Sequence, residues 1–410
     1  MQLITRQIGL FACYSVIILY QALNHSQGEA MQKIRLTADD IDVGQPLPWS
    51  VYGASDELLL DNGRIVSTEK QKGILVSRGL YRNPTKLEQE QQEALNKKKA
   101  AFALDSPFKV LDVIKITLKQ ILLDMESSVE SNYAHRVIRL ATVVQKLCYE
   151  NSDAALGAII LDQNSAYTNV HPVLCAMLSE LMLRRQKIPS EDRLFYIAAA
   201  LTQNIGMLSL QAQLTNQTEK LSDQQRQAIK EHPYRSKEIM QGLGIHYNEW
   251  LDTVSYHHER PDGKGYPNGL TGDSIPIYAK ILSLTDIYSA MILPRKYRDG
   301  FYVKKALQDI FIQRGKSVDE ACAMLLVKEM GIYPPGTFVK LANRDTAIVL
   351  RRGTKNADSP IVLSIIDPQG YYYDIPKKRE TIHKDIFGIT EVIPRLDDLQ
   401  LNRDEIWGLA

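Results

Sequence analysis

The chain has 410 residues, of which 44% are hydrophobic and 24% charged, and this is the composition of a folded globular protein of two or three domains. Its 49 basic and 48 acidic side chains leave a formal net charge of +1, so no overall basic field favours DNA, RNA or an anionic membrane surface. Cys13, Cys148, Cys175 and Cys322 form no CxxC pair, which favours buried thiols in a reducing compartment over a disulfide framework.

The amino-terminal segment is apolar over residues 8–23, IGLFACYSVIILYQAL. This run is shorter than the roughly 20 residues that a spanning helix needs. Three interpretations stay open. Residues 1–30 are a start-site artefact, with translation beginning at Met31 in a cytoplasmic protein; or the run is a membrane anchor; or it is a secretory signal peptide.

Residues 32–84 read as a small β-rich module. In ELLLDNGRIVST, two apolar runs flank Asn62-Gly63, which predicts a β-hairpin. The polar stretch KLEQEQQEALNKKKAA that follows has no apolar face, so residues 85–105 are expected to form a solvated linker.

A helical pattern extends over residues 106–330. Apolar residues recur three and four positions apart in two segments: Leu174, Met177, Leu178 and Leu181, then Leu194, Ile197, Ala198, Leu201, Ile205 and Leu208. Ser222 and Gln225 form a candidate capping box that opens the helix running to His232. In residues 331–395, the runs TFVKLA, TAIVLRR, PIVLSIID and YYYDIP predict short strands. We therefore expect a mainly α chain with a small β module at its N-terminal side and a β-barrel-like extension at its C-terminal side.

The candidate metal ligands are four histidines and one aspartate within the helical region: His171, His232, His257, His258 and Asp286. His171 is expected to open one helix, His232 to close another, and the adjacent pair to end a third. Asp286 lies within an apolar helix, where an unpaired carboxylate is costly to bury. Imidazoles and a carboxylate together suit Zn, Fe or Mn.

The motifs around these residues resemble the HD-GYP family. They are His-Pro at 232, HHERPDGKGYP at 257–267 and DIYSAMILPRKYR from 286. The spacing fits as well, with 32 residues from His171 to Gln203, 29 from there to His232, and 29 from His257 to Asp286. The resemblance implies an all-helical, metal-dependent phosphohydrolase that cleaves the bacterial second messenger cyclic di-GMP.

The sequence also departs from that family at its defining motif. The family reads HDIGK where this chain reads QNIGM. The resemblance places Gln203 at a metal-ligand histidine, Asn204 at the metal-bridging aspartate and Met207 at a phosphate-contacting lysine. Tyr167 stands where some members have a further metal-binding glutamate, and Ser289 where an aspartate is common.

These departures weaken the expected metal centre. A bridging carboxylate gives anionic oxygens to two cations, whereas an amide gives one neutral oxygen. The remaining ligands suit one divalent ion, so one ion, a metal-free polar core and a working dinuclear centre all stay open. If an acid substitutes for the lost pair, Glu259 and Asp262 are the nearest in sequence.

The ligand-facing motifs are better preserved. The resemblance places a recognition loop and two phosphate-contacting arginines at Asp262, Gly263, Gly265, Tyr266, Pro267, Arg295 and Arg298. Tyrosine in such a loop can stack on guanine, and arginine binds phosphate through its bidentate fork.

Three functional hypotheses follow. The first is a signalling protein with impaired or no phosphodiesterase activity, which binds cyclic di-GMP, a related nucleotide or a diguanylate-cyclase (GGDEF) partner. The second is an active metal-dependent phosphodiesterase that produces pGpG or GMP. The third is a non-catalytic scaffold similar to HDOD domains. No DNA or RNA partner is expected, and the sequence does not indicate the oligomeric state.

Overall fold

The computed structural model describes residues 34–53, 57–77, 80–82, 106–128, 132–162, 164–294, 303–353, 356–396 and 403–407. These residues fall into two compact units, 34–82 and 106–407. The apolar segment 8–23, the linker 85–105 and the two arginines, Arg295 and Arg298, lie outside the described residues. None of the helices described is both long enough and apolar enough to cross a membrane.

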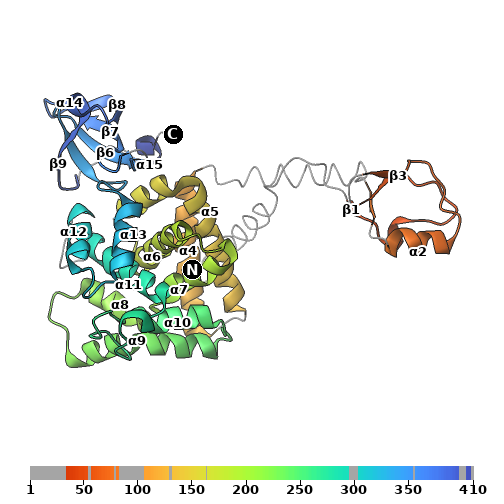
Figure 1. Cartoon of the computed structure of the whole chain (residues 1–410), viewed down its shortest axis with the longest axis horizontal. Coiled ribbons are helices and arrows are strands. Elements are labelled where there is room, and N and C mark those ends of the chain that lie inside the picture. The colour runs from red at the N-terminus through yellow and green to blue at the C-terminus, as the bar shows by residue number, and fades with distance from the viewer. Residues whose placement is uncertain are drawn as a thin grey trace, which may run out of the picture. The chain divides into compact units, whose positions relative to one another are not determined.

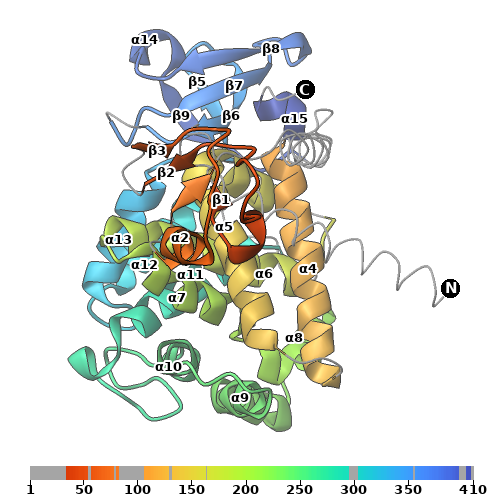
Figure 2. The same ribbon diagram turned by 90° about the vertical axis from the view of Figure 1, so that its right-hand side faces the viewer.

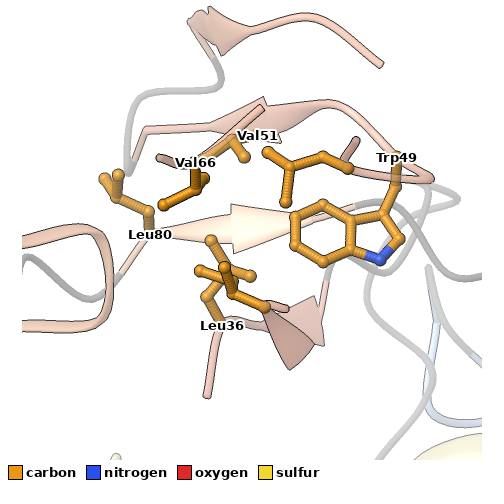
Figure 3. Packing of buried hydrophobic residues seen from close by; sticks show 7 residues of the cluster. Leu36, Trp49, Val51, Val66 and Leu80 are labelled. Atoms are coloured by element: carbon orange, nitrogen blue, oxygen red, sulfur yellow. The ribbon is translucent and has the colours of Figure 1, made fainter. Parts of the chain in front are cut away.

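The N-terminal unit is a four-stranded antiparallel sheet of strand order β1-β4-β2-β3 with one helix. Its elements are β1 (Ile34–Arg35), a 3-10 turn η1 (Ala38–Asp40), β2 (Val51–Tyr52), β3 (Leu58–Leu60), α2 (Glu69–Ser77) and β4 (Tyr81–Arg82). Figure 3 shows its core, in which the Trp49 ring packs among Leu36, Val51, Val66 and Leu80. Strands this short are stabilised by that shared apolar core.

The hairpin prediction for this unit is wrong in its pairing. Asn62-Gly63 does form a turn, with Gly63 at φ 87°. However, β3 pairs with β2, and Ile65 bridges to Pro46. The chain after the turn therefore leaves β3 and crosses to another segment.

The second unit contains the helical domain, and the prediction of a mainly α chain is confirmed. Its helices are α4 (Pro107–Ser127), α5 (Tyr133–Ile160), α6 (Tyr167–Arg185), α7 (Ser190–Thr202), η2 (Ile205–Met207), α8 (Leu208–Asn216), α9 (Asp223–Gly242), α10 (Asn248–Tyr256), η3 (Gly272–Ser274), α11 (Ile277–Ile292), α12 (Val303–Gln313) and α13 (Glu320–Met330). Figure 1 shows α6 in the middle of this bundle, in contact with α4, α5, α7 and α11. Because α6 is buried almost all round, it carries its polar side chains into the interior of the domain.

Several helix boundaries differ from the sequence prediction. The Ser222–Gln225 capping box is confirmed, with both reciprocal hydrogen bonds at 3.0 and 3.1 Å. The helix it opens, α9, continues past His232 to Gly242, so that histidine is central rather than terminal. His171 likewise lies in the second turn of α6. The helix α7 ends at Thr202, so QNIGM forms a break between helices instead of continuing one.

The C-terminal part of this unit is a five-stranded antiparallel sheet of order β8-β7-β6-β5-β9. Its elements are β5 (Phe338–Leu341), β6 (Thr346–Arg351), β7 (Ile361–Ile366), β8 (Tyr372–Glu380), α14 (Lys384–Phe387), β9 (Ile389–Val392) and α15 (Arg403–Trp407). Figure 2 shows the sheet at one end of the bundle, beside α4 and α5. Arg352 joins the two parts through ion pairs with Asp153 and Glu329, and the Trp407 ring packs edge-on against Phe108 at 5.7 Å.

Candidate metal centre

Two histidines from different helices face each other in the interior of the helical domain. His232 and His257 are fully buried, and their Nε2 atoms lie 3.3 Å apart. The Nδ1 atom of His232 is 2.6 Å from the carbonyl oxygen of Ile229, and that of His257 is 2.6 Å from the carbonyl oxygen of Val254. A carbonyl only accepts hydrogen bonds, so each Nδ1 carries the proton and each Nε2 presents a lone pair.

The local sequence makes both of these carbonyls available. Pro233 has no N–H group and so cannot donate the helical hydrogen bond to Ile229, four residues earlier. Val254 lies in the last turn of α10, where carbonyls lack partners within the helix. The His-Pro dipeptide and the end of a helix therefore fix the tautomers of His232 and His257.

Electrostatics keep these imidazoles neutral. Burial lowers the pKa of His232 to about 4. Burial, together with the neighbouring His232, lowers the pKa of His257 to about 3. His258, whose pKa burial also lowers, lies against His257 with a ring separation of 4.1 Å. At neutral pH three uncharged imidazoles thus lie together. The Nε2 lone pairs of His232 and His257 are directed at each other.

A divalent ion fits this arrangement. The ligand nitrogens of His232, His257 and His258 all lie within 4.8 Å of one another. Two imidazole nitrogens on a tetrahedral ion at ordinary bond lengths are about 3.3 Å apart, which is the separation seen between the Nε2 atoms of the first two. Facing lone pairs repel unless a cation lies between them, so the donor set suits a metal ion better than an empty polar core.

A second group of possible ligands lies on α6 and α11. The Nε2 atom of His171 is 3.4 Å from Oδ1 of Asp286, and the ring of Tyr167 stacks on that imidazole at 4.9 Å. The Sγ atom of Cys175, one helical turn further along α6, lies 3.9 Å from Nε2 of His171. These three residues also offer ligand atoms within 4.8 Å of one another. Burial raises the pKa of the Cys175 thiol well above its ordinary value.

The QNIGM segment lies between the two groups. Nε2 of Gln203 donates to Oδ1 of Asp286 at 3.2 Å, and the backbone oxygen of Gln203 accepts from Ser236 at 2.8 Å. Gly206 lies so close to α9 that a side-chain carbon there would be 2.8 Å from the backbone oxygen of His232. Oε1 of Gln203 and Oδ1 of Asn204 are buried and have no hydrogen-bond partner among the described residues. Two amide oxygens are therefore held beside the histidines without a donor from the part of the chain that the structure describes.

A cavity of about 190 Å³ opens beside both groups. The described residues that line it are Tyr167, His171, Asn204, Met207, Gln211, Leu214, Thr215, Ile229, His258, Tyr266, Asp286 and Ala290. None of them is a lysine or an arginine. The volume of the cavity is below the usual range for ligand pockets.

The comparisons with known proteins agree with this geometry. Residues 139–322 match the sequence model of the family described as HD domain. The helical domain is an HD domain of the HD-GYP family.

The chain is also similar to curated phosphodiesterases and to one solved structure. A 3′3′-cGAMP-specific phosphodiesterase of Vibrio cholerae is 29% identical over 180 residues, covering 44% of this chain and 39% of that protein. A cyclic di-GMP phosphodiesterase of Pseudomonas aeruginosa is 26% identical over 265 residues, covering 63% of each. The structure of an HDG"Y"P protein from Bdellovibrio bacteriovorus aligns with 72% of this chain and 99% of its own, at a TM-score of 0.46 and 16% identity. The chain spans less than two thirds of the length of these curated relatives.

The loop that gives the HD-GYP family part of its name has an acidic residue at its base. Oε1 and Oε2 of Glu259 accept backbone hydrogen bonds from Asn268 at 2.6 Å and Leu270 at 2.9 Å. Asp262 pairs with Arg260 at 2.6 Å. Both acids are therefore engaged in building the loop, and neither lines the described cavity, so we discard the interpretation that one of them substitutes for the lost aspartate.

The rest of this loop shapes the wall of the HD-GYP site. A side-chain carbon at Gly265 would lie 2.4 Å from the backbone nitrogen of Arg260, so only glycine fits there. Gly263 has φ 71°, a conformation that also favours glycine. The ring of Tyr266 packs on His258 at 4.7 Å and lines the cavity, whereas Gly263, Gly265 and Pro267 are not among the described lining residues.

The structure brings together the five predicted ligands of the HD-GYP site, although in two groups. His232, His257 and His258 form one, and His171 and Asp286 belong to the other. The sequence predicts only a buried thiol at Cys175, whereas the structure places it among the possible ligands. The available signal was its position four residues after His171, because residues so spaced share one face of a helix.

Proposed function

We propose that the HD-GYP domain of this chain binds a 3′,5′-cyclic dinucleotide, with cyclic di-GMP as the first candidate, and hydrolyses it slowly or not at all. The paired Nε2 atoms of His232 and His257, 3.3 Å apart with their protons fixed on Nδ1, carry this proposal. They support one divalent ion, completed by His258. When bound, such an ion supplies Lewis-acid stabilisation to phosphoryl oxygens.

The cavity beside this group supports a phosphodiester ligand. Tyr266 holds His258 in place through ring packing and forms part of the wall, where an aromatic ring can contact a base or sugar. Arg295 and Arg298, outside the described residues, stay a prediction as phosphate contacts. Relatives with this domain are named for cyclic di-GMP and for 3′3′-cGAMP, so both are candidate ligands.

Slow hydrolysis follows from the residues at the break after α7. Asn204 offers a neutral oxygen where two-metal chemistry needs an anionic bridge. Gln203 donates to Asp286 and so occupies one of its oxygens. Met207 gives the cavity wall a thioether where a cation would stabilise phosphate.

Isothermal titration calorimetry of the metal-loaded full chain tests this proposal. Cyclic di-GMP and 3′3′-cGAMP are titrated into wild type, into His257→Ala and into the control His246→Ala. We expect binding tighter than about 100 μM, or about −5.5 kcal/mol, for at least one nucleotide in wild type and in the control. Binding should be lost in His257→Ala. Absence of binding in wild type would refute the ligand proposal and leave a GGDEF protein, docked on the loop around Tyr266, as the remaining partner.

An active phosphodiesterase is the second candidate, and one observation favours it. The His171, Cys175 and Asp286 group could provide a further metal site and restore part of the charge that Asn204 lacks. Turnover assays with added Mn²⁺ or Fe²⁺ decide between the two candidates. Rapid formation of pGpG that His257→Ala abolishes and His246→Ala retains would establish the second.

A further inference from the structure

Cys175 lies where a metal ligand would lie. Its Sγ atom is 3.8 Å from Nδ1 and 3.9 Å from Nε2 of His171, and that Nε2 is 3.4 Å from Oδ1 of Asp286. On a tetrahedral ion at ordinary bond lengths, a nitrogen and an oxygen ligand are about 3.3 Å apart, and a nitrogen and a thiolate sulfur about 3.6 Å. The separations of His171 from Cys175 and from Asp286 are thus within a few tenths of an ångström of those on such an ion, and all three ligand atoms lie within 4.8 Å of one another.

A buried amide oxygen gives independent support. Gln203 is fully buried, and its Oε1 atom has no hydrogen-bond partner among the described residues. The Nε2 atom of the same carboxamide donates to Oδ1 of Asp286 at 3.2 Å, so this side chain belongs to the group. Leaving such an oxygen unsatisfied is unfavourable, and a cation among these residues would remove that cost.

The charges of the group also suit a divalent ion. Gln203 and Asn204 are neutral, so Asp286 is the one carboxylate among the described residues that line the cavity. A thiolate at Cys175 adds a second negative charge, and the two together balance a charge of +2. Thiolate with imidazole and carboxylate favours Zn²⁺, or Fe²⁺ and Co²⁺, over Mg²⁺ or Ca²⁺.

We propose that His171, Cys175 and Asp286 hold a second divalent ion of the thiolate-binding class, with Oε1 of Gln203 or a water as the fourth ligand. Binding forms the metal–sulfur bond and releases the thiol proton to solvent, with no change of oxidation state. Cys175 thereby replaces, from α6, the ligand that the resemblance assigns to position 203. The inference rests on the same cavity as the proposed function. A second ion alone does not replace the anionic bridge missing at Asn204, so it is compatible with slow hydrolysis, and the ion binds whether or not a nucleotide does.

Cobalt substitution of the metal-free full chain tests the inference. A Co²⁺–thiolate bond gives a charge-transfer absorption in the near ultraviolet, which ligation by nitrogen and oxygen alone does not. We expect wild type to bind two equivalents of Co²⁺ and to show this band. Cys175→Ser should lose the band and one equivalent. Cys148→Ser is the matched control, because Cys148 is equally buried and contacts Met177 instead of either ligand group, and it should keep both.

The same titration separates this inference from the proposed function. His257→Ala should lose the other equivalent but keep the thiolate band. A band that persists in Cys175→Ser, or two equivalents without a band in wild type, would overturn the assignment of Cys175. A third outcome is that wild type binds one equivalent of Co²⁺ without the thiolate band, and that His257→Ala does not bind this ion. That result would overturn the inference and leave the proposed function standing. Cys175→Ala, checked for native circular dichroism, repeats the test if the serine variant does not fold.

Discussion

At the scale of single residues, the most informative position is a proline next to a histidine. Pro233 leaves the carbonyl of Ile229 without its helical donor, and His232 uses that carbonyl to fix its tautomer. A residue that ordinarily disrupts a helix thus helps to prepare the imidazole for metal binding. The chemistry of His232 therefore depends on a neighbour that touches neither metal nor ligand.

Replacing Pro233 should change the stability of the protein and its affinity for metal in opposite directions. Pro233→Ala restores an N–H group that competes for Ile229, and it removes a residue that costs a helix interior about 3 kcal/mol. We expect the free energy of unfolding to rise while affinity for Zn²⁺ or Co²⁺ falls roughly 10-fold. Urea denaturation and competitive metal titration measure the two effects, with Pro189→Ala, at the N-cap of α7, as the control. Unchanged affinity would show that Pro233 has no influence on the imidazole.

A glycine in the loop gives a second test at this scale. A side-chain carbon at Gly265 would meet backbone atoms of Arg260, Glu259 and His258 at 2.4 to 2.6 Å. We expect Gly265→Ala to lower the free energy of unfolding by about 1–3 kcal/mol and to weaken nucleotide binding, because the loop must move. In the control Gly242→Ala, the new carbon meets nothing within 4 Å, so stability should be equal or slightly higher. Equal effects of the two changes in urea denaturation would disprove the steric argument.

At the scale of secondary-structure elements, the ends of helices determine the site. The helix α7 stops at Thr202, which lets Gln203 and Asn204 turn toward the histidines, while the end of α10 presents His257 and His258. The capping box of α9 fixes the start of the helix that carries His232. The ends of α7 and α10 therefore position these four residues, whereas the other candidate ligands lie within helices.

Loss of the cap should reduce stability without removing the metal. Ser222→Ala deletes the side chain that accepts from the Gln225 backbone at 3.1 Å, and we expect a loss of about 1 kcal/mol in urea denaturation. Ser222→Asp, which retains an acceptor, should stay near wild type. Metal content should be the same in all three proteins, because His232 lies almost three turns away. A full loss of metal in Ser222→Ala would contradict this separation.

The sequence predicts these elements only in part. The spacing of apolar residues, three and four positions apart, predicts the helices. Ser222 and Gln225 correctly mark the first residue of α9. The break after Thr202 was missed because Ile205 and Leu208 continue the apolar spacing, although they pack in η2 and α8. Periodicity reports which residues are buried, and a short break between two helices preserves that periodicity. The prediction of a hairpin at Asn62-Gly63 was wrong because turn residues indicate a turn but do not determine which strands pair.

At the scale of the whole molecule, the helical domain and the C-terminal sheet form one unit through a few buried polar contacts. Arg352 donates to the backbone oxygen of Glu329 at 2.8 Å and pairs with its carboxylate at 2.9 Å. It also pairs with Asp153 of α5. One arginine thus connects the end of β6 to two helices of the HD-GYP domain.

Removing this arginine should loosen the sheet. Arg352→Ala removes one of the two ion-pair partners of the Glu329 carboxylate, which is 8% exposed and keeps its pair with Arg185. We expect a loss of about 1–3 kcal/mol in the free energy of unfolding. The neighbouring Arg351 is exposed, so Arg351→Ala is the matched control and should stay near wild type. Limited proteolysis should cut between the sheet and the helices in the first variant only. Equal stability of the two variants would contradict this role.

The sequence predicted which ligands come together better than it predicted the roles of the residues around them. The spacing of His171, His232, His257 and Asp286 indicated a common centre, and the structure brings them together in the helical domain. It could not show that Cys175 joins them, because a lone cysteine on an apolar helix face has the same pattern as core packing. Nor could it show that Glu259 serves the loop, since the partners of a carboxylate depend on the tertiary fold.

The central claim is that the amide pair Gln203 and Asn204 suppresses hydrolysis in an otherwise retained HD-GYP site. The most direct measurement is the turnover rate of cyclic di-GMP, with Mn²⁺ or Fe²⁺, by wild type and by the double variant Gln203→His/Asn204→Asp. We predict that the double variant is at least about 100-fold faster, a difference of about 2.7 kcal/mol in the barrier. A wild-type protein that already turns over as fast as the double variant would contradict the claim.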